Sequence, residues 1–257
     1  MTDTATEPKG ERIAKLMARA GLCSRREAER WIADGRVSVA GETLASPAFN
    51  VTDPATVRVD GKPLPAAETT RLWRYHKPPG AVTTERDPEG RPTVFDRLPA
   101  GLPRVMTVGR LDIASEGLLL LTNDGALKRH LELPSTGWTR RYRVRVYGRV
   151  DPGKLAALAG GVTVEGMRYG AIQAGLERQE GANAWIAVAL REGKNREVRR
   201  VMEHLGYTVN RLIRTAYGPF QLGGLKRGAI EEAPARVLRD QLGQRLAARF
   251  GIADRRR

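Results

Sequence analysis

Residues 108–125 read VGRLDIASEGLLLLTNDG and place one acid, Asp112, two positions after Arg110. Four leucines, Leu118–Leu121, follow, and a short uninterrupted apolar run of this kind is typical of a strand buried on both faces. Gly109 permits a tight bend just before the acid. We therefore expect an interior strand that holds Asp112 in the loop at its edge, although a lone aspartate in such a loop is more often only a turn or cap residue.

The charge balance of the chain predicts a polyanionic partner. The 257 residues include 44 lysines and arginines against 29 aspartates and glutamates, which gives a formal net charge of +15. Such an excess attracts nucleic acid, and we favour this interpretation over a merely soluble basic surface. The length suffices for one good-sized core and a smaller module.

Cysteine and histidine usage excludes several kinds of site. Cys23 is the only cysteine, so neither an internal disulfide nor a cysteine-based zinc site can form. The three histidines, His76, His130 and His204, lie far apart without metal-ligand spacing, and we expect no metal. Residues 1–9 form a polar tail without the apolar segment of a signal peptide, and no apolar run is long enough to cross a bilayer. We expect a cytoplasmic protein that does not contact membranes.

Residues 10–68 predict a small unit of two helices followed by strands. Apolar residues recur at helical spacing over 13–20. Residues 24–27 read SRRE, a capping box that begins a second helix. The remaining expected elements are strands at 37–39 and 57–59 and a linker at 63–68.

Arg25 and Arg26 lie in the first turn of the second expected helix, where the helix dipole already presents positive charge. Cations are unfavourable there unless an anion binds, and a phosphate would resolve the conflict. The alternative is that both arginines simply point into water.

Residues 69–238 predict a larger α+β unit. Residues 142–147 alternate, with Tyr142 and two valines on one face and two arginines on the other. The apolar run 184–190 indicates a central strand buried on both faces. Further elements are expected as a strand at 72–75, a turn at 77–80, a helix from 152, a helix over 197–205, a strand at 209–214 and a basic, solvated helical tail at 239–257.

Four cations, Lys194, Arg196, Arg199 and Arg200, gather at the start of the helix expected from residue 197. This is again the unfavourable end for positive charge. Either a phosphate or a buried carboxylate would accommodate them. Because Arg199 and Arg200 flank two apolar helix residues, at most one of the two can point inward.

Long motifs along the chain closely resemble the pseudouridine synthases of the ribosomal small-subunit synthase A type, a family that also includes large-subunit enzymes. The matching stretches are LMARAGLCSRREAERWIADGRVSVAG, similar to an S4 RNA-binding domain, and then HKPPGAV, GRPTVFDRLP, VGRLDIASEGLLLLTNDG, RRYRVRVYG and REGKNREVRRVMEHLGYTVNRLIRTAYGP. The wording NREVRR and RLIR most resembles large-subunit enzymes of type B. One departure is Ala40-Gly41, where the S4 domain commonly has Asn before the glycine.

The resemblance implies a fold, an activity and roles for particular residues. The fold is an N-terminal S4 domain followed by a catalytic domain with a central mixed, largely antiparallel sheet and flanking helices. Asp112 matches the essential aspartate, Tyr142 the active-site tyrosine, and Arg196 lies in the block expected to supply a cationic partner, although Lys194 and Arg199 are alternatives. The residues expected to contact RNA are Arg110, which would fill the space of a flipped base, and Ser24, Arg25, Arg26, Arg36, Lys77, Lys194, Arg199 and Arg200.

The implied reaction is the isomerisation of uridine to pseudouridine in ribosomal RNA, without a cofactor. We expect a monomer whose partner is 23S rRNA or a pre-ribosomal particle, with a target uridine near the peptidyl-transferase centre. Three alternatives stay open: the same chemistry on small-subunit rRNA, a non-catalytic S4-type assembly factor, and a nucleoside or glycoside hydrolase. The last requires a second carboxylate, for which Glu116 is the nearby candidate.

Overall fold

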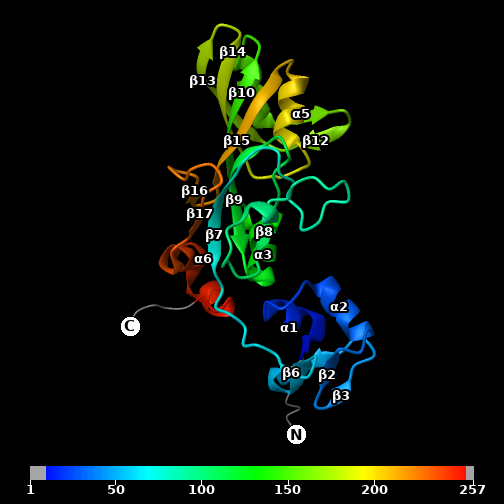
Figure 1. Ribbon diagram of the computed structural model, residues 1–257. Helices are drawn as coiled ribbons and strands as arrows, with labels where there is room; N and C mark the ends of the chain where they lie inside the picture. Colours follow the sequence, from blue (N-terminus) through cyan, green and yellow to red (C-terminus); the bar gives the residue numbers. More distant parts are fainter. Residues whose placement is uncertain (1–9, 253–257) are drawn as a thin grey trace.

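The computed structural model describes residues 10–252, which form two units joined by residues 64–71, a segment without helix or strand (Figure 1). The polar tail expected at 1–9 and the last five residues of the chain lie outside the described residues.

The N-terminal unit has the expected two helices and small sheet, and a core of its own. Its elements are β1 (Glu11–Arg12), α1 (Ile13–Arg19), α2 (Arg25–Ala33), β2 (Val37–Val39), β3 (Glu42–Thr43), β4 (Asn50–Val51), β5 (Val57–Val59) and β6 (Lys62–Pro63), with a 3₁₀ turn at Pro54–Thr56. The predicted capping box is confirmed, because the Glu27 amide donates to Ser24 Oγ at 3.2 Å and the Ser24 amide donates to the Glu27 carboxylate at 3.4 Å.

Ala40-Gly41, where the S4 domain commonly has Asn before the glycine, forms the hairpin loop between β2 and β3. Both residues have positive φ, 50° for Ala40 and 90° for Gly41. A two-residue hairpin loop of this kind favours Asn at the first position, since an alanine side chain is strained in the left-handed region.

The second unit is built on a nine-stranded sheet in which the main path runs β13-β14-β10-β15-β9-β7-β17. Only β9 and β15 are parallel neighbours, so the sheet is mixed and largely antiparallel, as predicted. The strands are β7 (Leu72–Lys77), β8 (Met106–Val108), β9 (Glu116–Thr122), β10 (Arg140–Tyr147), β13 (Ile172–Glu180), β14 (Asn183–Leu190), β15 (Thr208–Tyr217), β16 (Phe220–Gln221) and β17 (Ile230–Glu232); β11 (Val162–Val164) and β12 (Met167–Tyr169) form a separate hairpin.

The leucine run forms β9, and all seven residues of this strand are buried. Leu118 and Leu120 belong to one apolar cluster, whereas Leu119 and Leu121 belong to another. The strand is therefore covered on both faces, which confirms the prediction for this segment and fixes the position of the loop that precedes it.

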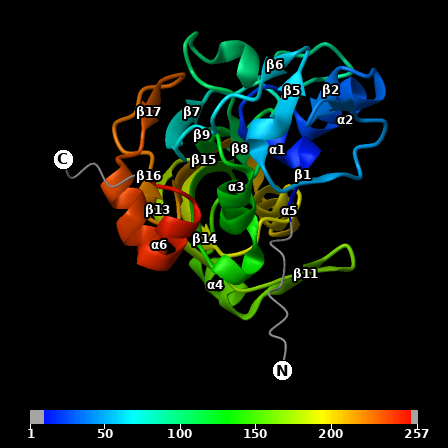
Figure 2. The same ribbon diagram turned by 90° about the horizontal axis from the view of Figure 1, so that it is seen from below.

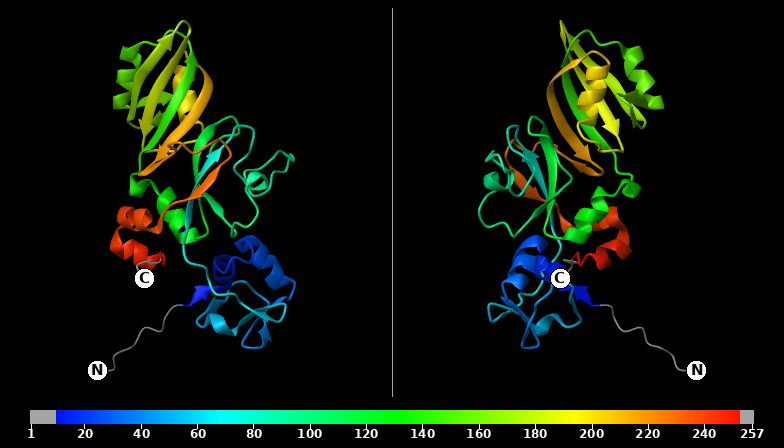
Figure 3. Two further views of the ribbon diagram at one scale, coloured as in Figure 1. Left: turned by 60° about the vertical axis from the view of Figure 1, so that its left-hand side comes forward. Right: turned by 90° about the vertical axis from the view of Figure 1, so that its right-hand side faces the viewer.

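Helices cover the sheet unevenly. α4 (Pro152–Ala157) and α5 (Glu197–His204) pack on one face of β10, β14 and β15, where they share an apolar core with Val144 and Val146. On the opposite face of these strands, no helix from residues 10–252 packs (Figure 3). The expectation that residues 184–190 are buried on both faces is consequently wrong: burial alternates along β14, and Ala187 is exposed.

The C-terminal segment also differs from expectation. α6 spans Ala235–Arg249, and the apolar residues Leu238, Leu242, Phe250 and Ile252 are buried in a cluster shared with α3 (Gly125–Glu132). The two helices lie side by side (Figures 1 and 2). The prediction of a solvated tail is wrong for residues 239–252, because apolar side chains spaced among the arginines anchor this segment to the core.

Candidate active site

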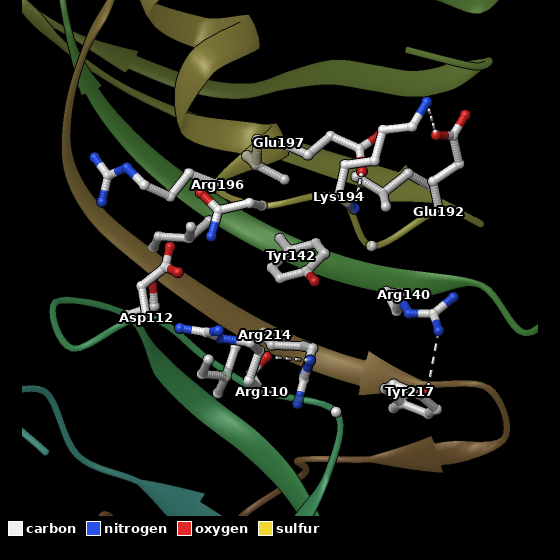
Figure 4. A pocket seen from close by; sticks show the side chains of 18 of the residues that line it. Arg110, Asp112, Arg140, Tyr142, Glu192, Lys194, Arg196, Glu197, Arg214 and Tyr217 are labelled. Atoms are coloured by element: carbon white, nitrogen blue, oxygen red, sulfur yellow. Dashed lines mark hydrogen bonds and ion pairs between the residues drawn. The ribbon is translucent and has the colours of Figure 1, made fainter. Parts of the chain in front are cut away.

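A cavity of about 560 Å³ lies between the loop before β9 and the N-terminal end of α5 (Figure 4). Its lining includes Arg110, Asp112, Tyr142, Lys194 and Arg196. The structure thus brings together all three residues predicted to be catalytic and two of those predicted to contact RNA, from three segments that are far apart in the sequence.

The loop that carries Asp112 is held through its backbone. Each carbonyl oxygen from residue 110 to residue 115 accepts at least one hydrogen bond. The donors are Arg214 for residue 110, Thr83 for 111, Lys77 and the Ser115 amide for 112, Lys77 and the Gly80 amide for 113, Arg199 for 114 and Lys77 for 115. Because an unpaired buried carbonyl is costly, this network restricts the loop to one conformation.

Lys77 is the main donor of this network. Its side chain is fully buried at the end of β7, and Nζ lies 2.9 Å from the Ser115 carbonyl oxygen and 3.2 Å from that of Asp112. Burial lowers its pKa to about 8. The prediction that Lys77 binds RNA is wrong, since the ammonium group lies beneath the loop, where a phosphate cannot reach it.

Arg199 is the second buried cation under the loop. Its guanidinium donates to the Ala114 carbonyl at 3.1 Å from the first turns of α5, and only 7% of the residue is exposed. Burial lowers its pKa, while the charge of Asp112 acts in the opposite direction. The prediction that Arg199 contacts RNA is therefore wrong. Arg199 is a buried cation that interacts electrostatically with Asp112. Arg200 is only partly buried, so one of the two arginines points inward, as expected.

The predicted ion pair between Arg196 and Asp112 is not formed. It precedes α5 with φ 51° and ψ 26°, is exposed, and contributes to the cavity wall. Among residues 10–252, Asp112 has no ion pair within 4.0 Å, with Arg196 or with any other cation. Lys194 bonds elsewhere, to the Glu192 carboxylate at 2.6 Å and to the Arg168 carbonyl at 2.6 Å.

Tyr142 lies on β10 between Asp112 and Arg140 (Figure 4). The residue is partly buried and packs against two apolar clusters while it still lines the cavity. A half-buried ring with a fixed backbone is suited to stack on a planar base. Arg110, at the cavity edge, is exposed.

Two further groups were missed in the sequence. Arg214 is 3% exposed and donates from Nε to the Leu118 carbonyl at 2.7 Å, which ties β15 to β9. At the other end of the cavity, Arg140 donates to Tyr217 Oη at 2.9 Å, and that hydroxyl donates to the Leu131 carbonyl at 2.8 Å. The alternation of residue types in β15 contained a signal for Arg214, which lies two positions after the buried Leu212 and so on the same face.

The predicted RNA contacts of the N-terminal unit lie apart from the cavity lining. Ser24 caps α2, and Arg25 and Arg26 are exposed in its first turn. Arg36 pairs with Asp60 at 2.6 Å and stacks over a tryptophan ring, so part of its charge is already compensated. Their role in RNA binding stays a prediction.

Comparison with known proteins agrees with this arrangement. The family model described as RNA pseudouridylate synthase matches residues 71–204, and the S4 domain model matches residues 11–55. An uncharacterized RNA pseudouridine synthase of Rickettsia bellii is 47% identical over 227 residues, 88% of this chain and 98% of the relative. A solved structure, described as a crystal structure of pseudouridylate synthase, superposes with a TM-score of 0.63 at 24% identity and covers 90% of this chain and 100% of that chain, so it supports the fold.

Relatives with a more specific name are similarly close. The ribosomal large subunit pseudouridine synthase B of Yersinia pestis is 45% identical over 230 residues, 87% of this chain and 72% of the relative. That of Haemophilus influenzae is 46% identical over 238 residues, 89% of this chain and 66% of the relative. The chain belongs to the RNA pseudouridylate synthase family and carries an N-terminal S4 domain. The family resemblance inferred from the motifs is thereby confirmed.

Proposed function

We propose that this protein isomerises a uridine of 23S rRNA, near the peptidyl-transferase centre, to pseudouridine. The similarity to large-subunit synthases of type B supports this choice of RNA. One observation carries the assignment of Asp112 as the essential acid. Buried cations hold the Asp112 loop at the wall of a cavity, and Tyr142 lines the same cavity.

The reaction breaks the N1–C1′ bond of uridine and forms a C5–C1′ bond, and the proton on C5 is replaced by one on N1. A stacked base is out of reach, so the target must be flipped into the cavity at a cost of a few kcal/mol. Phosphate contacts offset this cost. We assign such contacts to Arg25, Arg26 and Arg200, and we assign to Arg110 the space that the flipped base leaves.

Asp112 acts as an ionised carboxylate at the ribose. The positive charges of Arg199 and Lys77 lie beneath its loop and interact with it. Attack on C1′ and removal of the 2′ proton toward a glycal are both compatible with this arrangement. Of the three candidate cations, we assign Arg199 as the electrostatic partner, because its guanidinium is buried under the Asp112 loop and interacts with the charge of Asp112. Arg196 is exposed instead, and Lys194 pairs with Glu192.

Tyr142 would stack on the uracil and assist removal of the C5 proton once the C5–C1′ bond has formed. Recapture of the detached uracil requires that water be kept out of the site. Lys194 and Arg196, which belong to the segment facing the Asp112 loop across the cavity, are placed to contact the nucleotide backbone. We further propose that the protein acts as a monomer in the cytoplasm; none of the helices within residues 10–252 is long and apolar enough to span a membrane.

The test is Asp112→Asn, with Asp240→Asn on the exposed surface of α6 as the matched control. We expect Asp112→Asn to abolish pseudouridine formation in 23S rRNA fragments while RNA affinity stays within about threefold, and the control to resemble the wild type. Turnover by Asp112→Asn would contradict the assignment.

The same assay separates the alternatives. Modification of 16S but not 23S fragments would indicate a small-subunit enzyme, and release of free uracil would indicate a hydrolase. Wild-type protein that binds rRNA without modifying it would indicate a non-catalytic assembly factor.

A further inference from the structure

The helix-free face of the large sheet is rich in arginine. On β10 the buried residues Val144 and Val146 point toward α4 and α5, while the intervening Arg141, Arg143 and Arg145 are exposed. Neighbours across a sheet share a face, and the helix-free side of β10, β14 and β15 is visible in the left view of Figure 3. The catalytic Tyr142 lies on the other face, since its cross-strand neighbours Val188 and Arg214 are both buried.

Four of the residues on this face form one row across four strands. In register, Arg178 of β13 pairs with Trp185 of β14, Trp185 with Arg145 of β10, and Arg145 with Arg211 of β15. Directly opposed like charges such as Arg145 and Arg211 destabilise a sheet. Arg211 is paired with Glu116, whereas Arg141 and Arg145 form no ion pair within residues 10–252.

Trp185 contacts two arginines of this face, Arg143 and Arg211. The guanidinium carbon of Arg143 lies 4.8 Å from the centre of its ring system, and that of Arg211 lies 6.0 Å from it. Cation–π contacts of this kind hold the two cations in place without neutralising their charge. Arg143 also pairs with Glu177 at 2.8 Å, Arg211 with the buried Glu116, and Arg178 with Glu180. The guanidinium groups of Arg143 and Arg211 are thus pre-organised, which lowers the entropic cost of binding a ligand.

We propose that this arginine face, made of Arg141, Arg143, Arg145, Arg178, Arg211 and Trp185, binds the phosphate backbone of an rRNA segment distant from the target uridine. Guanidinium groups match phosphate geometry in a bidentate manner. The contact is to backbone and not to stacked bases, because arginines already occupy the Trp185 ring. The identity of the RNA rests on the proposed function. Since the cavity opens on the α5 side, a short stem-loop bound there leaves the arginine face unoccupied, and only a longer RNA reaches both.

The test compares two RNAs with the double variant Arg145→Gln/Arg178→Gln. The first RNA is a short stem-loop that contains the target uridine, and the second is a 23S rRNA domain that contains the same stem-loop. We expect affinity for the long RNA to fall about tenfold, and the slope of log affinity against log salt to decrease by about 0.7 to 0.9 per arginine removed. Turnover of the short stem-loop should stay within about twofold of the wild type. The matched control, Arg236→Gln/Arg249→Gln on α6, removes the same charge elsewhere.

A second variant, Trp185→Leu, tests the pre-organisation. Its affinity for the long RNA should also be lower than that of the wild type, although all the arginines are present. Urea unfolding shows whether the variant is folded. Wild-type affinity of this variant would overturn the role of the tryptophan.

Three outcomes overturn the proposal itself: unchanged long-RNA affinity and salt slope in Arg145→Gln/Arg178→Gln, an equal loss in the α6 control, or unchanged RNA binding with lost association to pre-ribosomal particles, which would indicate a protein partner. Failure of the wild type to modify either RNA would contradict the proposed function alone, because binding by the arginine face is measured separately.

Discussion

Replacing Lys77 by methionine removes the cation under the Asp112 loop while nearly preserving side-chain volume. In the wild type, Nζ of this residue lies within 3.5 Å of the carbonyl oxygens of residues 78, 112, 113 and 115 and shares its three protons among them. Two of these keep another donor in the variant, namely the Ser115 amide for residue 112 at 2.9 Å and the Gly80 amide for residue 113 at 2.7 Å. The carbonyls of Pro78 and Ser115 lose the donor that the structure gives them.

The cost follows from those two acceptors. Leaving a buried acceptor unpaired costs about 1–3 kcal/mol, and the variant regains part of this because it no longer buries a charge. We expect the free energy of unfolding of Lys77→Met to fall by about 2–4 kcal/mol. Because the loop then has more than one conformation, Asp112 is misplaced, and a displacement of about 1 Å costs roughly 100-fold in rate. RNA affinity should not change.

The pH dependence gives a second signature. The Lys77 pKa is about 8 in the folded protein against an ordinary value of 10.5. Below pH 8 both states carry the charge, so the cost of burying it is present in full. As the pH rises from about 8 to 10.5 the unfolded state binds more protons, and the contribution of this group to the free energy of unfolding rises. The Lys77→Met variant should lack this rise.

Urea unfolding at several pH values, single-turnover pseudouridine formation and RNA binding are the three measurements. Lys226→Met, an exposed lysine, is the control and should change the free energy of unfolding by less than about 0.5 kcal/mol. If Lys77→Met lost RNA affinity but kept wild-type turnover of bound RNA and wild-type stability, the buried role assigned to Lys77 would be wrong.

Three further predictions concern stability. Ala40→Asn should raise the free energy of unfolding by about 0.5–1 kcal/mol, because Asn tolerates positive φ better than Ala; an unchanged value would show that the hairpin is not strained. Burial raises the pKa of Glu197, so its stabilising contribution is lost as the pH rises above 4.5, and Glu197→Gln should be the more stable form at pH 7 but not at pH 4. Truncation after Pro234 removes α6 and should destabilise the second unit by more than about 4 kcal/mol in thermal unfolding, whereas a solvated tail would be dispensable.

Elements with a strong local pattern were predictable from the sequence. The capping box at 24–27 and the leucine run of β9 both appear where expected, because each depends on residues next to one another. The sequence analysis missed α3, which begins where Asp124 accepts hydrogen bonds from the amides of residues 126 and 127. β13 was missed as well, because its polar sequence lies on an edge strand with one face in solvent.

The expected strand over 184–190 shows why apolar runs mislead. Small residues such as Ala187 count as apolar in a pattern but bury little area, so they are equally stable on an exposed face. Whether the second face is covered depends on where helices pack, and this is decided by the connections of the whole sheet. The same error concealed the arginine face, because a strand thought to be buried on both sides offers no binding surface.

Which residues line the cavity was easier to predict from the sequence than the role of each residue. Asp112, Tyr142 and Arg196 do line one cavity, but the donors that fix the Asp112 loop come from residues 77, 83, 199 and 214. In a sequence, a lysine or arginine near a proposed RNA site is indistinguishable from a phosphate contact. Burial separates the two classes here. Lys77, Arg199 and Arg214 are buried and donate to backbone carbonyl oxygens in and beside the Asp112 loop, whereas Arg110 and Arg196 are exposed. Under the proposed function, these backbone-bound cations place positive charge near Asp112 without occupying the carboxylate oxygens that would reach the ribose.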